Sequence, residues 1–123
     1  MEDLNRPRVL IVDDDRTVRG FVAVGLGDDC VVDEACDAET ALEAATARPP
    51  DLVLLDVSLG GHSGLDILID LREKFEVPVV MLTAASDEAT EWRSRDLGAA
   101  AFVAKPVDAD DLRRLVLQYL PST

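Results

Sequence analysis

The apolar residues of this chain fall into short continuous runs that are separated by amphipathic stretches. Four runs of four apolar residues each end at a polar side chain, and they cover residues 9–12, 52–55, 79–82 and 101–104. A weaker fifth run begins at Val31-Val32 and is broken by Asp33-Glu34. Short runs of this kind are typical of strands buried on both faces of a parallel sheet. We therefore expect five strands, with the broken run at an edge of the sheet.

Helical periodicity fills the segments between these runs, over residues 16–26, 38–47, 64–75, 86–97 and 108–120. Asp37 and Ser86 are expected as N-terminal caps, and Gly98 as the end of the fourth helix. Within these helices we expect Phe21 on the buried face and Trp92 in the core, with a partner surface as the alternative for Trp92. The alternation predicts an α/β fold, a doubly wound five-stranded parallel sheet with helices on both faces.

No linker, repeat or change of composition interrupts this alternation. We therefore expect a single domain over residues 1–123, with its core at about 8–120 and no effector domain in this chain. Because the N-terminus lacks a signal peptide and no run of about 20 apolar residues occurs, the sequence predicts a cytoplasmic protein without membrane association. Cys30 and Cys36 flank a predicted strand, too far apart to bridge, and are expected to be buried or half-buried.

The charge balance narrows the possible partners. The chain carries 25 acidic and 12 basic residues, a net charge of -13. Phosphate-rich surfaces would repel such a chain, so the sequence predicts no direct nucleic-acid binding. One histidine and two cysteines are too few for the usual four-ligand zinc site. The excess acid favours basic partners, or a site that holds a cation.

Candidate chemistry lies where the predicted strands end. Asp13-Asp14-Asp15 follows the first run, and Asp56, Thr83 and Lys105 follow three of the others. Since ligands of open α/β sheets bind at the carboxyl ends of the strands, these side chains are expected to converge. Clustered carboxylates favour a hard cation such as Mg²⁺. A hydroxyl and a lysine beside that cation favour a phosphoryl group, and an aspartate can itself be the nucleophile.

In this order, and on these strands, the residues resemble the receiver domain of two-component response regulators over nearly the whole chain. The resemblance implies a flavodoxin-like (βα)5 three-layer sandwich. It implies that Asp56 accepts a phosphoryl group from a histidine kinase or phosphotransfer protein. It also implies that Mg²⁺ is held by Asp13, Asp14 and Asp56, with Asp14 the closer of the acidic pair, together with the backbone carbonyl of Ser58.

The same resemblance implies a signalling switch rather than an enzyme with an external substrate. Lys105 corresponds to the family's active-site lysine and precedes Pro106, which is usually cis in the family. Thr83 and Phe102 correspond to the switch pair, which would alter the face read by an unknown downstream protein or effector domain. The loop after Asp56 departs from the family pattern, because Gly60 replaces the usual proline. That loop is expected to be looser, since glycine costs more entropy to order.

Two other functions remain open at this point. Residues 9–17 also match the first motif of haloacid-dehalogenase-type phosphotransferases, an apolar strand followed by Asp-x-Asp-x-Thr, with Asp13 as nucleophile. That class needs a second acidic pair after a later strand, whereas Asp110-Asp111 lies in an amphipathic helical pattern. The other alternative is a receiver-like interaction module that is never phosphorylated. A serine hydrolase is a weaker alternative still, because the only histidine, His62, is adjacent to Ser63 and cannot act as its base.

Overall fold

A single parallel sheet forms the centre of the protein in the computed structural model, which describes residues 6–59, 62–83, 88–105 and 107–120. Its strands are β1 (Arg8–Val12), β2 (Val31–Ala35), β3 (Leu52–Asp56), β6 (Val79–Thr83) and β7 (Ala101–Ala104). They lie in the order β2-β1-β3-β6-β7, and all four pairings are parallel. The predicted fold is confirmed, and the broken run, β2, lies at an edge.

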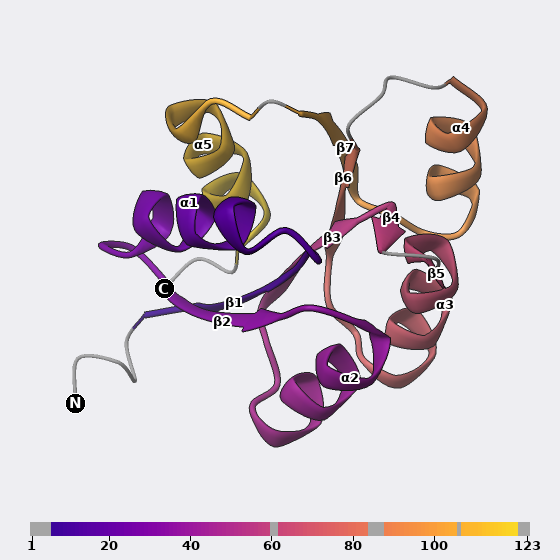
Figure 1. The fold of residues 1–123 in the computed structure, drawn as a ribbon, viewed down its shortest axis with the longest axis horizontal. Coiled ribbons are helices and arrows are strands. Elements are labelled where there is room, and N and C mark those ends of the chain that lie inside the picture. Colours follow the sequence, from indigo (N-terminus) through magenta and orange to yellow (C-terminus); the bar gives the residue numbers. More distant parts are fainter. Residues whose placement is uncertain (1–5, 60–61, 84–87, 106, 121–123) are drawn as a thin grey trace.

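Five helices cover the two faces of this sheet: α1 (Arg16–Leu26), α2 (Ala38–Ala47), α3 (Gly64–Lys74), α4 (Glu88–Asp96) and α5 (Ala109–Tyr119). Figure 1 shows α1 and α5 on one face and α2, α3 and α4 on the other. The core is accordingly divided in two. Leu26 of α1 and Val116 of α5 pack in one cluster, and Ala41 of α2 and Leu68 of α3 pack in the other. The apolar runs that were predicted as strands separate these clusters.

Side-chain caps fix where several helices begin. Asp37 accepts a hydrogen bond from the Thr40 amide, and the Thr40 hydroxyl oxygen accepts one from the Asp37 amide, which forms a reciprocal cap on α2. Asp15 caps α1 and Asp108 caps α5, and each side chain accepts hydrogen bonds from backbone amides in the first turn of its helix. Gly98 follows α4 with a φ of 100°, a left-handed conformation suited to glycine. Ser86, which was predicted to cap the fourth helix, lies outside the described residues, as do Gly60 and Pro106.

The expected positions of Phe21, Trp92 and Cys36 were wrong, because all three side chains are exposed, Phe21 to 46% and Trp92 to 68%. On α1 the buried side chains are Val22 and Leu26, and Phe21 is turned about 100° from Val22 around the helix axis and further still from Leu26. On α4 the only buried side chain is the small Ser94, and Trp92 has polar residues one turn away on either side.

A short hairpin that the sequence did not predict follows β3. It pairs β4 (Ser58–Leu59) with β5 (His62–Ser63) in antiparallel fashion and leads directly into α3. The hairpin forms the loop beside Asp56, so it bears on the candidate site. None of the helices in the described part of the chain is both long enough and apolar enough to cross a bilayer.

Candidate functional site

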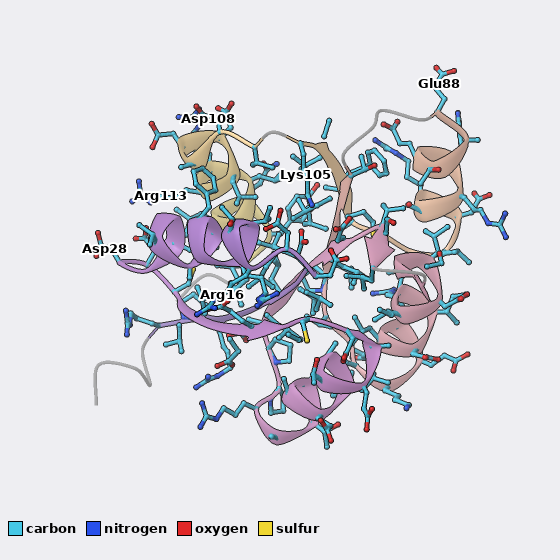
Figure 2. The ribbon with its side chains drawn as sticks, viewed as in Figure 1. Arg16, Asp28, Glu88, Lys105, Asp108 and Arg113 are labelled. Atoms are coloured by element: carbon cyan, nitrogen blue, oxygen red, sulfur yellow. The ribbon has the colours of Figure 1, made fainter. Side chains whose placement is uncertain are left out.

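The carboxyl ends of β1, β3 and β7 bring two acids and a lysine together. The register pairs Val12 of β1 with Leu55 of β3, so the next residues, Asp13 and Asp56, leave the sheet side by side. Lys105 directly follows β7, and its Nζ lies 2.7 Å from Asp13 Oδ2 and 3.2 Å from Asp56 Oδ2. Figure 2 shows Lys105 pointing inward from the segment after β7. One ammonium group therefore bridges two carboxylates.

A third carboxylate joins this pair. Asp13, Asp14 and Asp56 each offer an oxygen, and these oxygens all lie within 4.8 Å of one another. Asp13 is fully buried and Asp56 is 6% exposed, whereas Asp14 faces solvent. Three carboxylates at this spacing repel one another, and Lys105 supplies one positive charge against them. Hard oxygen ligands with an open, solvent-facing side fit Mg²⁺, which retains several waters when it binds.

Burial and neighbouring charges shift the pKa values of Asp56 and Lys105. Burial raises the pKa of Asp56, and the neighbouring charge of Asp13 adds to that effect, while the Ser58 amide and Lys105 oppose it. For Lys105, burial alone would lower the pKa. The hydrogen bond to Asp13 and the charges of both acids outweigh burial, so the pKa of Lys105 is raised. The ionised form of Asp56 is thus costly here, whereas the charged form of Lys105 is favoured.

The backbone around Asp56 is held closely against the start of α3. The Ser58 amide donates to Asp56 Oδ1 at 3.1 Å, and the Gly64 amide donates to the carbonyl of Val57 at 2.6 Å. A Cβ atom on Gly64 would lie 2.0 Å from the carbonyl oxygen of Asp56. In the sequence, Gly64 is recognisable only as the first residue of a predicted helix. The structure shows that the approach of α3 to the Asp56 backbone requires a residue without a side chain.

The acid loop after β1 is fixed by its own hydrogen bonds. Asp13 Oδ1 accepts from the Asp15 amide at 2.9 Å, and Asp15 Oδ1 accepts from the Thr17 amide at 2.8 Å. Arg19 Nη1 donates to the Asp13 carbonyl at 2.7 Å, and Arg19 Nε lies 3.2 Å from Glu34 Oε1. Asp15 therefore acts as a helix cap. Arg19 was not among the predicted site residues, and only its position in the first turn after the acids could have indicated a role.

The remaining predicted site residues are Thr83, Phe102 and Ser58. Thr83 ends β6 and directly follows Leu82, which pairs with Asp56, so Thr83 lies at the same edge of the sheet as Asp56. Its side chain is nearly buried, with 7% exposed. Met81 is paired with Phe102 of β7, and alternate residues of a strand face the same side, so Thr83 and Phe102 share one face of the sheet. Phe102 is half-buried against the cluster that contains Met81. The side chain of Ser58 is exposed, and its carbonyl as a metal ligand stays a prediction.

The family model described as "Response regulator receiver domain" matches residues 9–117. The chain is 37% identical over 106 residues to the KDP operon transcriptional regulatory protein KdpE of Escherichia coli (strain K12), an alignment that covers 85% of this chain and 47% of KdpE. The chain spans about half the length of the curated relatives it matches.

Solved structures show the same likeness. The receiver domain of NtrX from Brucella abortus has a TM-score of 0.87 and 34% sequence identity, and the match covers 94% of this chain and 99% of that one. A BeF3-activated receiver domain of DrrB has a TM-score of 0.84 and 26% identity, with coverage of 93% and 97%. The sequence and the fold therefore resemble the same group of proteins.

Proposed function

Because the chain belongs to the response regulator receiver domain family, we propose that it is a phosphorylation switch whose phosphoacceptor is Asp56. The observation that carries the proposal is the position of the Asp56 carboxylate, which is nearly buried, 3.2 Å from Lys105 Nζ and within 4.8 Å of two further carboxylates. In the proposed step a carboxylate oxygen of Asp56 attacks the phosphorus of a phosphohistidine on a kinase or phosphotransfer protein. The P–O bond forms as the P–N bond breaks, and the imidazole leaves.

The residues around Asp56 suit that step. Lys105 would stabilise negative charge on the phosphoryl oxygens, and Thr83 would donate a hydrogen bond to one of them. Asp13, Asp14 and Asp56, with the Ser58 carbonyl, would hold Mg²⁺. The bound cation would supply charge neutralisation at the phosphoryl oxygens. In the proposed reaction the phosphoryl group is transferred to Asp56 of the protein itself, so we propose a signalling switch rather than an enzyme with an external substrate.

The structure does not favour the dehalogenase-type alternative. That reading needs a second acidic pair at a strand end, but Asp110 and Asp111 are exposed in the first turn of α5. The interaction module that is never phosphorylated is also less favoured, because the proposed phosphoacceptor Asp56 lies close to Asp13, Asp14 and Lys105. We further propose that the receiver unit, at about residues 8–120, acts on a downstream protein or on an effector domain beyond this sequence.

The phosphoacceptor assignment predicts a simple labelling result. With phosphoramidate as a small P–N donor and Mg²⁺, intact mass measurement should show one added phosphoryl group on the wild type and none on Asp56→Asn. Chelation of Mg²⁺ should slow the labelling strongly. Asp13→Asn is the matched control, because it also removes one charge from the cluster but keeps the acceptor, so it should be labelled slowly.

Two results would contradict this assignment. Full labelling of Asp56→Asn together with loss of labelling in Asp13→Asn would favour the dehalogenase-type reading. If the wild type stays unlabelled both with the small donor and with a phosphohistidine protein, the interaction module is favoured.

The switch proposal concerns Thr83 and Phe102. If the phosphoryl group draws Thr83 inward, Phe102 on the same face can move into the vacated space. Thr83→Ala should still accept phosphate on Asp56, because the acceptor and Lys105 remain, but amide chemical shifts near Phe102 and α4 should no longer respond. Phe102 lacks a hydroxyl, so packing alone separates its two positions. Burial of an aromatic side chain is worth roughly 1.5–3 kcal/mol. That is enough to shift the populations of the two Phe102 positions, but not enough to lock the protein in one of them.

This coupling is measured by NMR with and without a phosphoryl analogue. Thr46→Ala on the exposed side of α2 is the matched control and should respond as the wild type does. If Thr83→Ala shows the same shift changes near Phe102 as the wild type, the coupling is wrong and the phosphoacceptor assignment is unaffected.

A further inference from the structure

Arg19 ties the acid loop to the end of a neighbouring strand. Its side chain is 16% exposed, although arginine is seldom so buried unless it is paired. Nη1 donates to the carbonyl oxygen of Asp13 at 2.7 Å, and Nε lies 3.2 Å from Glu34 Oε1 on β2. One nitrogen of the planar guanidinium therefore donates to a loop carbonyl, and a second nitrogen is paired with a carboxylate.

The carbonyl that Arg19 holds belongs to the peptide between Asp13 and Asp14. The direction of that peptide sets where the Asp14 side chain leaves the backbone. The Asp13 carboxylate is held directly by the Asp15 amide and by Lys105. Asp14, by contrast, is exposed, so its position depends on the backbone that carries it.

We propose that Arg19 is a positioning residue that pre-forms the cation site by clamping the Asp13–Asp14 peptide, with Glu34 holding the guanidinium in place. The inference rests on the proposed function, since it assumes that Mg²⁺ binds at Asp13, Asp14 and Asp56. Arg19 would not contact the cation. Because Arg19 orders the loop before the cation binds, Mg²⁺ binding would no longer carry the free-energy cost of ordering that loop.

Charge and geometry predict opposite effects here, which makes the proposal testable. Arg19 is a positive charge close to the cation site, so Coulomb repulsion alone would let its removal strengthen Mg²⁺ binding. Loss of the clamp would weaken binding instead. The sign of the change in affinity therefore separates positioning from simple electrostatics.

The experiment measures Mg²⁺ affinity without using phosphorylation. Mg²⁺ is titrated while the melting temperature and the Asp14 and Asp15 amide shifts are followed. Arg19→Gln should bind Mg²⁺ roughly 10-fold more weakly, the low end for hydrogen bonds behind metal ligands. Arg16→Gln, an exposed arginine of the same helix labelled in Figure 2, loses the same charge and should bind as tightly as the wild type or slightly more tightly.

Further variants keep the outcome decisive. Arg19→Lys keeps the charge but lacks the planar fork, so it should also bind more weakly, and it carries the test if Arg19→Gln does not fold. Suppose that the wild type binds Mg²⁺, and that Arg19→Lys and folded Arg19→Gln bind it as tightly as the wild type does. The clamp is then overturned, and the metal site stands. If the wild type shows no response, or the same response as Asp14→Asn, the proposed metal site fails and the clamp fails with it.

Discussion

A Gly64→Ala variant is expected to lose about 3 kcal/mol of folding free energy, the upper end of the roughly 1–3 kcal/mol typical of overpacked sites. The added Cβ would lie 2.0 Å from the Asp56 carbonyl oxygen and 3.0 Å from the Val57 Cα. Both are backbone atoms, so no side chain can move aside to make room. Either α3 or the turn after β3 must shift, and the Gly64–Val57 hydrogen bond would be strained. A fall of about 10–15 °C in melting temperature should follow.

The same substitution at Gly20 provides the control. Gly20 lies inside α1, and an added Cβ would meet no atom within 4 Å apart from its chain neighbours and the backbone of its own helix. Because alanine favours a helix interior over glycine by about 0.5–1 kcal/mol, Gly20→Ala should be slightly more stable than the wild type. The two variants should therefore shift the melting temperature in opposite directions. A Gly64→Ala protein as stable as the wild type would show that the contact at Asp56 is not tight.

The effect at Gly64 should also extend to the candidate site. Asp56 Oδ1 is held by the amide of Ser58, two residues further along the same turn. A shift of this turn moves the carboxylate relative to Lys105 and Asp13, which are anchored on other strands. Labelling by the small phosphodonor should therefore slow in Gly64→Ala, even at temperatures where the variant is fully folded.

Most of the fold could be predicted because its signals are local in sequence. Buried parallel strands need continuous apolar runs, and Asp37 with Thr40 forms a cap within one turn of helix. The convergence of Asp13, Asp56 and Lys105 could be predicted as well, because strand ends in such a sheet meet at one edge. The positions of Phe21 and Trp92 were predicted wrongly. Helical spacing indicates which side of a helix is apolar, but it does not indicate how much of that side the sheet covers.

The parts that escaped prediction depend on contacts between distant elements. Gly64 matters because α3 approaches the backbone of β3, and a glycine at a helix start gives no sign of that. Arg19 matters because the end of β2 brings Glu34 next to α1. The hairpin of β4 and β5 consists of two residues on each side, too few for an alternating pattern to be visible.

A Lys105→Met variant is expected to lose about 2 kcal/mol of stability at pH 7 in the absence of Mg²⁺. Lys105 Nζ bridges Asp13 and Asp56, and without it two nearly buried carboxylates face each other. Removal of one partner from a buried ion pair typically costs about 3–5 kcal/mol. The expected loss is smaller, because the Lys105 side chain is 18% exposed and solvent screens part of the interaction. Chemical denaturation at several pH values measures it.

The pH dependence of this loss identifies its cause. The pKa of Lys105 is raised in the folded state, so its contribution is fully present at neutral pH and is lost only as the pH rises through that raised value. The pKa of Asp56 is also raised, so ionised Asp56 costs stability at neutral pH, and this cost disappears as the carboxyl protonates on acidification. Without Lys105, ionised Asp56 costs more stability. The difference in free energy of unfolding between Lys105→Met and the wild type should therefore narrow as the pH falls toward about 4.

Mg²⁺ and a second lysine complete the test. If the cation binds among these carboxylates, millimolar Mg²⁺ should narrow the same gap at pH 7, because it replaces the missing positive charge. Lys74→Met, at the exposed end of α3, removes the other lysine of the sequence and should cost less than about 1 kcal/mol, with no response to Mg²⁺. A Lys105→Met loss that stays constant from pH 7 to pH 4 and in Mg²⁺ would mean that Lys105 stabilises the protein by packing, and that the charge balance among Asp13, Asp56 and Lys105 contributes little.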